Sequence, residues 1–383
     1  MTQLPDGRYV DDAPYDPQQS IQQLERRDLD APNWLLVWRK FRTHKLGLIS
    51  GIFLLLSYLL LPFMGFIAPY SPNFRNADHL YAPPQAVRWV HEGEFLGPFI
   101  YPITAEADLE TFQWTFVPDT ENPQRIRFFC EGDSYKLAGL IESDTHLFCA
   151  PEGATLFLWG SDRLGRDVFS RILYGAQLSL TVGLIGISVS FVLGIFFGSL
   201  AGYLGGKTDW VINRVIEILR SLPELPLWLA LSAAVPSNWS PVAVFFIISV
   251  ILGILDWPGL ARSVRAKFLS LREEEYVRAA EMMGAGKGRV IRKHLLPNFM
   301  SHLIASATLS IPAMILGETA LSFLGLGLRA PAVSWGVMLN DAQNLASIEL
   351  YPWTAIPMLP IVVVVLAFNF LGDGLRDSLD PYS

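Results

Sequence analysis

Three stretches of the chain are long, apolar and free of charged side chains. They run over Leu46–Ala68, Leu178–Leu204 and Tyr351–Leu371. Since an α-helix rises about 1.5 Å per residue, each stretch is long enough to cross a hydrocarbon core of about 30 Å. The pattern therefore predicts three membrane-spanning helices.

Three shorter apolar segments lie between these stretches, and each ends beside an ionisable residue. The segments are Pro226–Val235 (continuing a segment from Val211), Pro241–Leu255 and Phe299–Leu316, and the residues are Glu224, Asp256 and Glu318. Core helices of a soluble domain would also fit segments of this length. The full-length spans around them favour a membrane bundle, whose inner helices can be shorter and more polar. We predict an all-α polytopic membrane protein with six transmembrane helices.

The basic residues near the ends of these segments predict the orientation of the chain. They gather before the first span, between the second and third, and between the fourth and fifth, where the block from Arg262 to Lys293 is densest. Lysine and arginine accumulate on the cytoplasmic side of membrane proteins. We therefore expect a multi-pass membrane protein with both termini in the cytoplasm.

The segment between the first and second helices is then extracytoplasmic. Residues 70–160 hold 5 basic and 13 acidic side chains, a net charge of 5 − 13 = −8. Aromatic residues alternate with polar ones at Phe112, Trp114 and Phe116, as in half-buried strands, so we expect a β-rich insert over residues 69–160. Both cysteines, Cys130 and Cys149, fall inside it. A disulfide suits an oxidising compartment, and two unrelated buried thiols are the alternative.

Composition supports a chain partly dissolved in lipid. Hydrophobic residues make up 51% of the 383 residues and charged residues only 17%, against about 25% charged in a typical soluble domain. The net charge of −7 offers no footprint for nucleic acid. The polar start has no signal-peptide pattern. Residues 1–45 are expected to be a cytoplasmic tail whose basic, aromatic end forms an amphipathic helix at the membrane surface, or a simple extension of the first span.

The cytoplasmic segment 262–297 shows the pattern of a docking loop. It reads as two short helices broken at Gly284–Gly288, with Ala279, Ala280 and Met283 on one face of the first and Val290, Ile291 and Leu295 on one face of the second. Pro297 is expected to end the second helix before the next membrane span. A small-faced helix fixed at both ends could seat in a groove of a partner and transmit its movement to the membrane.

The same loop does not bind a nucleotide by itself. A phosphate-binding loop needs two glycines five residues apart, followed by lysine and a hydroxyl residue, after a strand. The run from Gly284 to Arg289 has neither that spacing nor the hydroxyl. The six histidines show no metal-ligand spacing, and no serine lies in a nucleophile elbow. We expect no enzyme activity, no metal and no cofactor, with energy supplied by a partner.

Several motifs of the chain resemble the permeases of ABC importers, and specifically the second permease of the oligopeptide/dipeptide/nickel group. The docking loop resembles the EAA motif of that family. Further matching segments are Gly160–Arg171, Ala201–Gly206, Trp257–Arg262, Leu321–Gly327, Ser334–Gly336 and Ala367–Asp380. The resemblance covers roughly residues 34–76 and 157–381. It implies a permease core over residues 161–383, after a first span over residues 46–68.

The resemblance implies a set of partners and roles. A second, different permease would complete the pathway, two ATPase subunits would bind ATP and dock on the loop, and an extracytoplasmic solute-binding protein would deliver the cargo. The docking residues carried over are Tyr276, Ala279, Ala280, Gly284, Leu296 and Pro297. Arg278 and His294 depart from the family pattern, and the acidic insert exceeds the family's usual external loop.

Alternatives remain open at two points. The cargo implied by the family is peptide, but related permeases carry oligosaccharides or nickel, and a membrane-anchored sensor or scaffold is a different class of function. Intramembrane acids cost roughly 2.5–3.5 kcal/mol each, more than a simple anchor would justify. Glu318, and with it Asp256, is expected at the pathway or its gate, or alternatively as a structural acid that bonds a neighbouring helix end.

Overall fold

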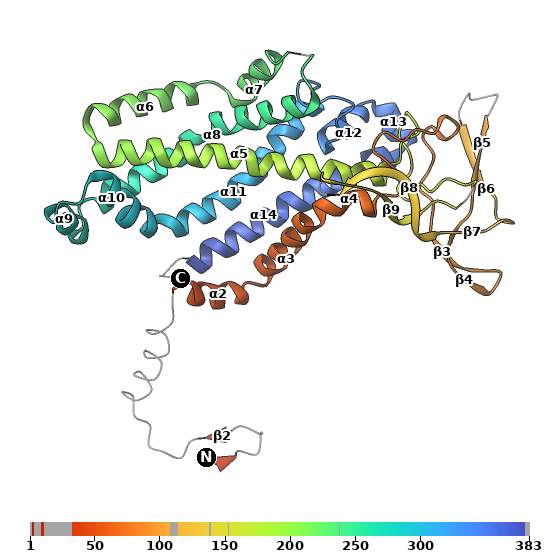
Figure 1. Cartoon of the computed structure of the whole chain (residues 1–383), viewed down its shortest axis with the longest axis horizontal. Helices are drawn as coiled ribbons and strands as arrows, with labels where there is room; N and C mark the ends of the chain where they lie inside the picture. Colours follow the sequence, from red (N-terminus) through yellow and green to blue (C-terminus); the bar gives the residue numbers. More distant parts are fainter. Residues whose placement is uncertain are drawn as a thin grey trace.

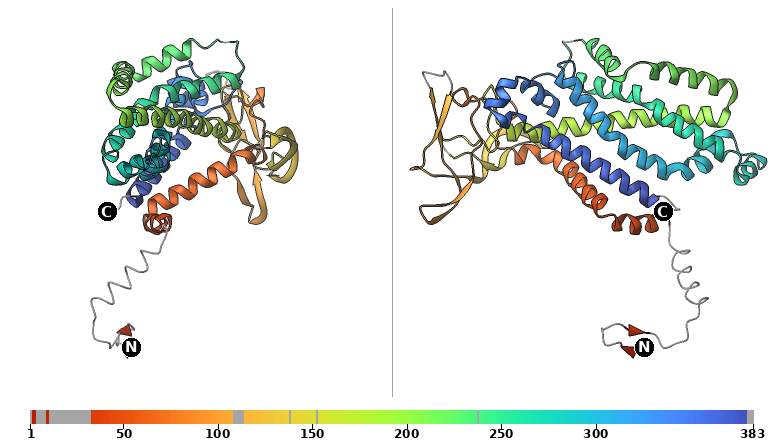
Figure 2. Two further views of the ribbon diagram at one scale, coloured as in Figure 1. Left: turned by 60° about the vertical axis from the view of Figure 1, so that its left-hand side comes forward. Right: turned by 180° about the vertical axis from the view of Figure 1, so that it is seen from behind.

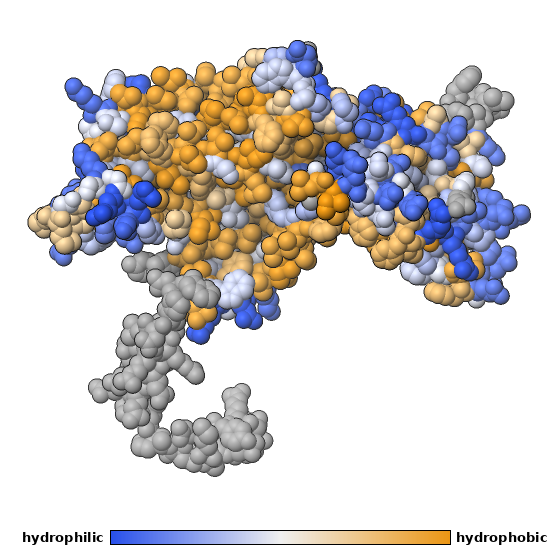
Figure 3. Space-filling view, in the orientation of Figure 1, coloured by the Kyte–Doolittle hydropathy of each residue, from blue (hydrophilic) through white to orange (hydrophobic). Residues whose placement is uncertain are grey.

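The computed structural model describes residues 2–3, 9–10, 33–107, 114–137, 139–151, 153–236 and 238–379. Within these residues the protein is predominantly helical. An elongated helix bundle occupies one end of the molecule, and a group of antiparallel strands lies at the other end (Figure 1). Apolar side chains cover the flank of the bundle, whereas hydrophilic residues collect at its two ends (Figure 3).

Five helical segments are long and apolar enough to cross a membrane. They are Lys45–Ile67, Val168–Leu204, Pro241–Leu271, Lys287–Phe323 and Pro352–Leu379. In element terms they are α3 (Lys45–Leu60) with η1 (Leu61–Phe63) and α4 (Met64–Ile67), α5 (Val168–Leu204), α8 (Pro241–Leu271), α10 (Lys287–Val290) running into α11 (Leu296–Phe323), and η4 (Pro352–Ala355) with α14 (Met358–Leu379). The chain is therefore a multi-pass membrane protein.

The predicted third helix is broken in two. The segment from Val211 lies in α6 (Gly206–Ser221), and α7 (Glu224–Ala233) follows after an extended residue, Leu222. Pro223 causes the break, because its ring disfavours helical backbone at the residue before it and it has no N–H to donate. At ten residues, α7 spans about 15 Å, half of a hydrocarbon core. Among the described residues, five helices rather than six have the length of a span.

Helix α5 starts at Val168 rather than at Leu178. Its glycines allow it to pack closely against α8. Gly194, Gly198 and Gly202 recur every four residues and face α8. A Cβ at Gly198 would lie 2.6 Å from the carbonyl oxygen of Ala261, so only glycine permits this approach. Small residues at such spacing bring membrane helices into backbone contact. Helices α5 and α8 are thus packed with their backbones in close contact.

The remaining spans pack on the other side of α5. Helix α14 lies between α3 and α11, and the three helices share an apolar core with α5 that includes Leu54, Ile315 and Phe368. Before α3, helix α2 (Asn33–Thr43) ends at His44, whose ring nitrogen accepts the N–H of Gly47. The helix before the first span is therefore separate from it and not its extension.

The strands form three small antiparallel sheets between α4 and α5. One holds β3 (Arg88–His91), β4 (Glu94–Ile100) and β7 (Gln124–Arg125), another β5 (Ile103–Ala107) and β6 (Trp114–Pro118), and the last β8 (Arg127–Leu137) and β9 (Ile141–Cys149). Phe112 lies outside the described residues. Cys130 and Cys149 are joined by a disulfide, the pairing expected from the sequence. A further two-stranded pair, β1 (Thr2–Gln3) and β2 (Tyr9–Val10), lies near the N-terminus.

Short helices complete this end of the bundle. They are η2 (Ala77–His79), α12 (Trp335–Asp341) and α13 (Leu345–Leu350). Strands β3–β9 and these short helices gather at one end, whereas α9 (Glu275–Met282) projects at the opposite end (Figure 2). The two candidate sites of the molecule, described next, lie at these opposite ends.

Candidate functional site

The predicted docking loop is a rigid projection at the end of the bundle. Helix α8 ends at Leu271, α9 follows, and a turn at Gly284 (φ +83°) reverses the chain before α10. Val277, Val290 and Leu295 are fully buried in one apolar cluster together with Phe268 of α8. The loop is therefore packed on α8 and α11, so that a displacement of α9 is carried to both helices.

The outward face of α9 differs from the predicted one. Ala280 is 3% exposed and packs inward with Val277, three residues earlier, while Ala279 is half-buried. Met282 and Met283 are 84% and 83% exposed. The predicted common outward face of Ala279, Ala280 and Met283 is wrong, because Ala280 packs inward and the exposed Met283 lies just beyond the last residue of α9. The large apolar side chains exposed at the tip are this methionine pair.

The second half of the loop also differs from the prediction. Pro297 does not end a helix: a π-helical turn, Ile291–Leu295, joins α10 to α11, and Pro297 lies in the first turn of α11. A proline is tolerated there because the first N–H groups of an α-helix have no partner within the helix. Leu296 is half-buried and Pro297 exposed. The docking loop thus runs into a membrane span without a hinge.

Three polar contacts fix the loop further. The guanidinium of Arg278 lies 2.6 Å from the carboxylate of Glu273 and lowers the pKa of that carboxyl below its usual range. The Tyr276 hydroxyl accepts a hydrogen bond from the Asn298 side chain at 2.8 Å. On α5, the Tyr203 hydroxyl donates to Glu281 of α9. Arg278, a departure from the family pattern, therefore has a local structural partner, and His294 is half-buried in the π turn.

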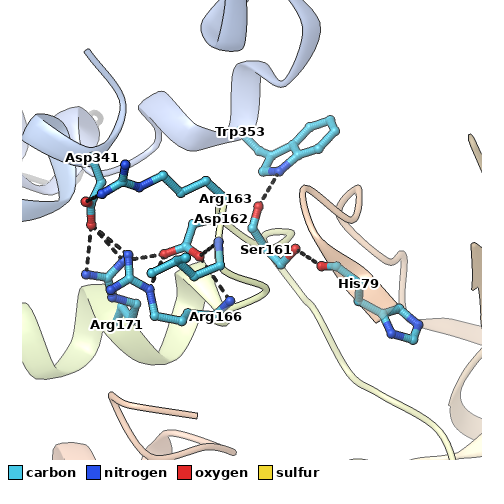
Figure 4. Close-up of polar contacts among 9 residues, drawn as sticks. His79, Ser161, Asp162, Arg163, Arg166, Arg171, Asp341 and Trp353 are labelled. Atoms are coloured by element: carbon cyan, nitrogen blue, oxygen red, sulfur yellow. Dashed lines mark hydrogen bonds and ion pairs between the residues drawn. The ribbon is translucent and has the colours of Figure 1, made fainter. Parts of the chain in front are cut away.

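A buried ion cluster lies at the other end of the bundle and was not predicted from the sequence (Figure 4). Asp162 accepts from Arg166 at 2.6 Å and from Arg171 at 2.5 Å. Asp341 of α12 contacts Arg163 at 2.9 Å, Arg166 at 2.7 Å and Arg171 at 3.3 Å. The side chains of Arg166 and Arg171 are only 7% and 2% exposed. Burial would raise the pKa of Asp341, but the three guanidinium groups hold it below the usual range.

The loop around this cluster is organised by its own polar groups. The Asp162 side chain accepts the N–H groups of Leu164 and Arg166, which curls the loop over the carboxylate. Ser161 donates to the carbonyl of His79, and its own carbonyl accepts from the Trp353 indole (Figure 4). The start of α5, η2, α12 and η4 are thereby tied into one unit. Because Arg171 is paired inside the protein, α5 can begin within a charged segment.

The two predicted membrane acids lie in different places. Glu318 is fully buried, and its Oε1 accepts from Ser322 at 2.7 Å and from Ser334 at 2.8 Å. Ser334 in turn caps α12 by accepting the N–H of Val337. This arrangement matches the alternative of a structural acid that bonds a neighbouring helix end.

Asp256 instead lines an open cavity of about 310 Å³ between α6, α8 and α11. Its carboxylate accepts from Ser190 at 2.9 Å. Polar side chains line this cavity, including Arg220, Ser263, Ser306 and Ser310. Glu318 is not among the lining residues, so the structure does not bring the two acids together. Among the described residues no group of three or more His, Cys, Asp or Glu side chains could hold a metal.

Comparisons with known proteins agree with this architecture. Residues 194–382 match the family described as binding-protein-dependent transport system inner membrane component. Residues 33–84 match the N-terminal TM domain of oligopeptide transport permease C. The acidic, strand-bearing segment lies largely between the two matched ranges.

Individual relatives are similar over most of their length. The dipeptide transport system permease protein DppC of Bacillus subtilis is 43% identical over 225 residues, 58% of this chain and 68% of that protein. The oligopeptide transport system permease protein OppC of Haemophilus influenzae is 40% identical over 233 residues, 61% of this chain and 72% of that protein. A solved inward-facing MetNI methionine ABC transporter chain shares 18% identity with a TM-score of 0.42, covering 55% of this chain and 96% of that one. The chain belongs to the permease family of ABC importers and is of the OppC/DppC type.

Proposed function

We propose that this permease forms half of the pathway of an ATP-driven peptide importer. The cargo assignment is supported by relatives that are named dipeptide and oligopeptide permeases. The observation that carries the coupling role is the docking loop, whose exposed methionine pair stands on a base packed against two membrane helices. A partner that moved this tip would move α8 and α11.

We infer six crossings and cytoplasmic termini, and the connectivity of the helices supports this assignment. Helix α5 ends at the α9 end of the bundle, and α8 begins at the opposite end, so the chain between them must return across the membrane (Figure 1). Helices α6 and α7 together make that return, side by side with α5 and α8. We assign α7, with the second half of α6, as the third crossing. We assign the end that carries α9 to the cytoplasm, because the residues around it are basic.

The partners of such an importer bind at the two ends of the bundle. Two ATPase subunits would dock on this loop and the corresponding loop of a second, different permease, and they would hold the ATP. A solute-binding protein would deliver cargo at the opposite end, where the ion cluster holds α5, η2, α12 and η4 together. The bacterial inner membrane is the location implied by the family description.

The cavity that contains Asp256 is the best candidate for the pathway in this chain. A half-buried carboxylate at the middle of α8 would be costly if it faced lipid, since a central acid costs roughly 2.5–3.5 kcal/mol or more. Arg220 and three serines make the same surface polar. We place this surface opposite the second permease across a water-filled path. Glu318 lies outside this surface and accepts a hydrogen bond from Ser334, which caps α12.

Purification through an affinity tag on this chain tests the proposal. Membranes solubilised in mild detergent should yield an ATPase and a second permease with the tagged chain, whereas a sensor or scaffold would bring down neither. In liposomes, Asp256→Asn should reduce peptide uptake while the assembled complex is retained, and Glu318→Gln should leave uptake near normal. Stimulation of the ATPase by oligosaccharides and not by peptides would assign the alternative cargo.

A further inference from the structure

The β8–β9 ribbon is docked on the outer end of the first membrane helix (Figures 1 and 2). The fully buried ring of His146 bridges the carbonyl oxygens of Ala68 (2.5 Å) and Asp133 (2.8 Å). Asp133 also accepts the N–H of Ser71 at 2.9 Å. The ring of Tyr135 covers Gly65 so closely that no Cβ could fit there. The ribbon is thus fixed to the helix end at several points.

The order of these contacts gives the direction in which the ribbon points. Asp133 meets Ser71 beyond the end of α4, and Tyr135, two residues further, meets Gly65 inside α4. Moving toward the hairpin turn therefore means moving down the helix toward the hydrocarbon. Ile141 lies two rungs beyond the Tyr135–Ser143 pair, which at about 3.3 Å per residue is about 7 Å further along the ribbon.

The side chains at this turn suit lipid rather than water. Leu140 is 86% exposed and Ile141 is 64% exposed. Strand alternation puts Ile141 on the same side as Tyr135, which faces α4, and turns the Lys136–Glu142 pair to the other side. The neighbouring helix surface is also apolar and open, with Leu59 at 58% and Phe63 at 46% exposure.

We propose that the tip of the β8–β9 hairpin inserts into the outer leaflet, where Leu140 and Ile141 contact acyl chains. The occupant is lipid because the tip continues the apolar surface of the first membrane span. Interfacial segments of this kind bury their apolar face about 5–10 Å into the boundary between headgroups and acyl chains. The ribbon then holds the insert at a fixed angle to the membrane, through the joint made by His146 and Tyr135.

The other exposed hairpin of the insert provides a matched control. Phe95 of β4 is 74% exposed, yet β3 and β4 project away from the helix bundle (Figure 1). An exposed apolar residue there should remain in water. Exposure alone therefore does not distinguish the two hairpins, but their placement relative to α4 does.

Site-directed fluorescence in proteoliposomes tests the proposal. Leu140→Cys, Phe95→Cys and Leu59→Cys are each labelled with bimane in the full chain, in its complex. The native cysteines do not react because they form the disulfide. Quenching is measured with brominated acyl chains and with aqueous iodide present on both sides of the membrane. A second variant, Ile141→Asp, is combined with the label at residue 140.

We expect the label at residue 140 to be quenched by brominated lipid to the same extent as at residue 59, and the label at residue 95 only by iodide. Ile141→Asp should reduce the lipid quenching at residue 140. Iodide quenching at residue 140 equal to that at residue 95 would overturn the proposal. Protection of residue 140 from both quenchers would also overturn it, because a protein partner would then cover the tip.

Discussion

Truncation of the methionine pair at the tip of α9 should uncouple the permease from its ATPase without unfolding it. The perturbation is Met282→Ala together with Met283→Ala. Both side chains are more than 80% exposed in this chain, so nearly all of their apolar surface is available to a partner. Burying one methionine fully is worth about 1.5–3 kcal/mol. If the partner buries one of the two methionines, the double variant should raise the Kd for docking by about 10- to 100-fold, since about 1.4 kcal/mol corresponds to a factor of ten.

The assay is a titration of the ATPase subunits onto the permease pair in nanodiscs, read as the Kd for binding and as stimulated ATP hydrolysis. The melting temperature of the permease should not change, because exposed substitutions usually alter stability by less than about 0.5 kcal/mol. Met358→Ala, an exposed methionine at the start of α14, is the matched control and should bind normally. An unchanged Kd in the double variant would refute the assignment of α9 as the docking element.

Substitution at Ala280 would not be an equally clean experiment. Its side chain is 3% exposed, and Val277, which is buried on the same helix, belongs to the cluster that holds the loop on α8 and α11. A tryptophan there would overpack this core at a cost of about 1–3 kcal/mol. A loss of docking in that variant would report on the loop's position, whereas the methionine variant reports on the contact itself.

Three further predictions concern the opposite end of the bundle. Asp162→Ala removes one of the two carboxylates that the buried Arg166 and Arg171 share, the other being that of Asp341, so thermal melting should show a loss of up to about 3–5 kcal/mol; an unchanged melting temperature would contradict the cluster. Serine at both Cys130 and Cys149 should destabilise the insert by about 3 kcal/mol, seen as faster proteolysis of the insert alone; equal proteolysis would show that the disulfide adds no stability. Burial raises the pKa of Asp167 to about 7 from an ordinary value near 3.8. The free energy of unfolding should therefore fall as the pH rises from about 4 to 7, because the unfolded chain releases this proton at a lower pH than the folded protein. Asp167→Asn keeps the side-chain acceptor that caps the N–H of Ser170 but carries no charge. The melting temperature of the variant should therefore rise relative to that of the wild type as the pH increases from about 4 to 7. A difference in melting temperature that does not change with pH would contradict a buried, protonated Asp167.

The hydropathy pattern located the membrane helices well where no buried charge interrupts them. It placed α3 with α4 within a residue or two, but began α5 ten residues late because Arg171 resembles a surface residue in the sequence. Only the structure shows that Asp162 and Asp341 neutralise it. Asp341 lies far along the chain in a short polar helix, and no local pattern marks it as a partner. Pairing over such a distance is a property of the tertiary fold.

Predictions from local sequence rules were wrong where tertiary packing or a neighbouring turn changed the outcome. Proline was expected to end a helix at Pro297, but the π turn before it lets the helix continue, whereas Pro223 does break its helix. In α9, the small side chains of Ala279 and Ala280 predicted that these residues contact a partner. In the structure Ala280 is buried, and the neighbouring methionines are exposed instead. The motif located the predicted docking loop, and the tertiary packing determines which of its side chains are exposed.

ATP-dependent peptide uptake is the measurement that tests the central claim most directly. The complex purified through this chain is reconstituted into liposomes. In the vesicles whose lumen contains the ATPase subunits, ATP is enclosed in the lumen and the solute-binding protein is added outside. We predict accumulation of a labelled di- or oligopeptide that stops without ATP and is lost in the Met282→Ala, Met283→Ala variant. Binding of peptide without ATP-dependent accumulation, or uptake that is unaffected by the variant, would contradict the account.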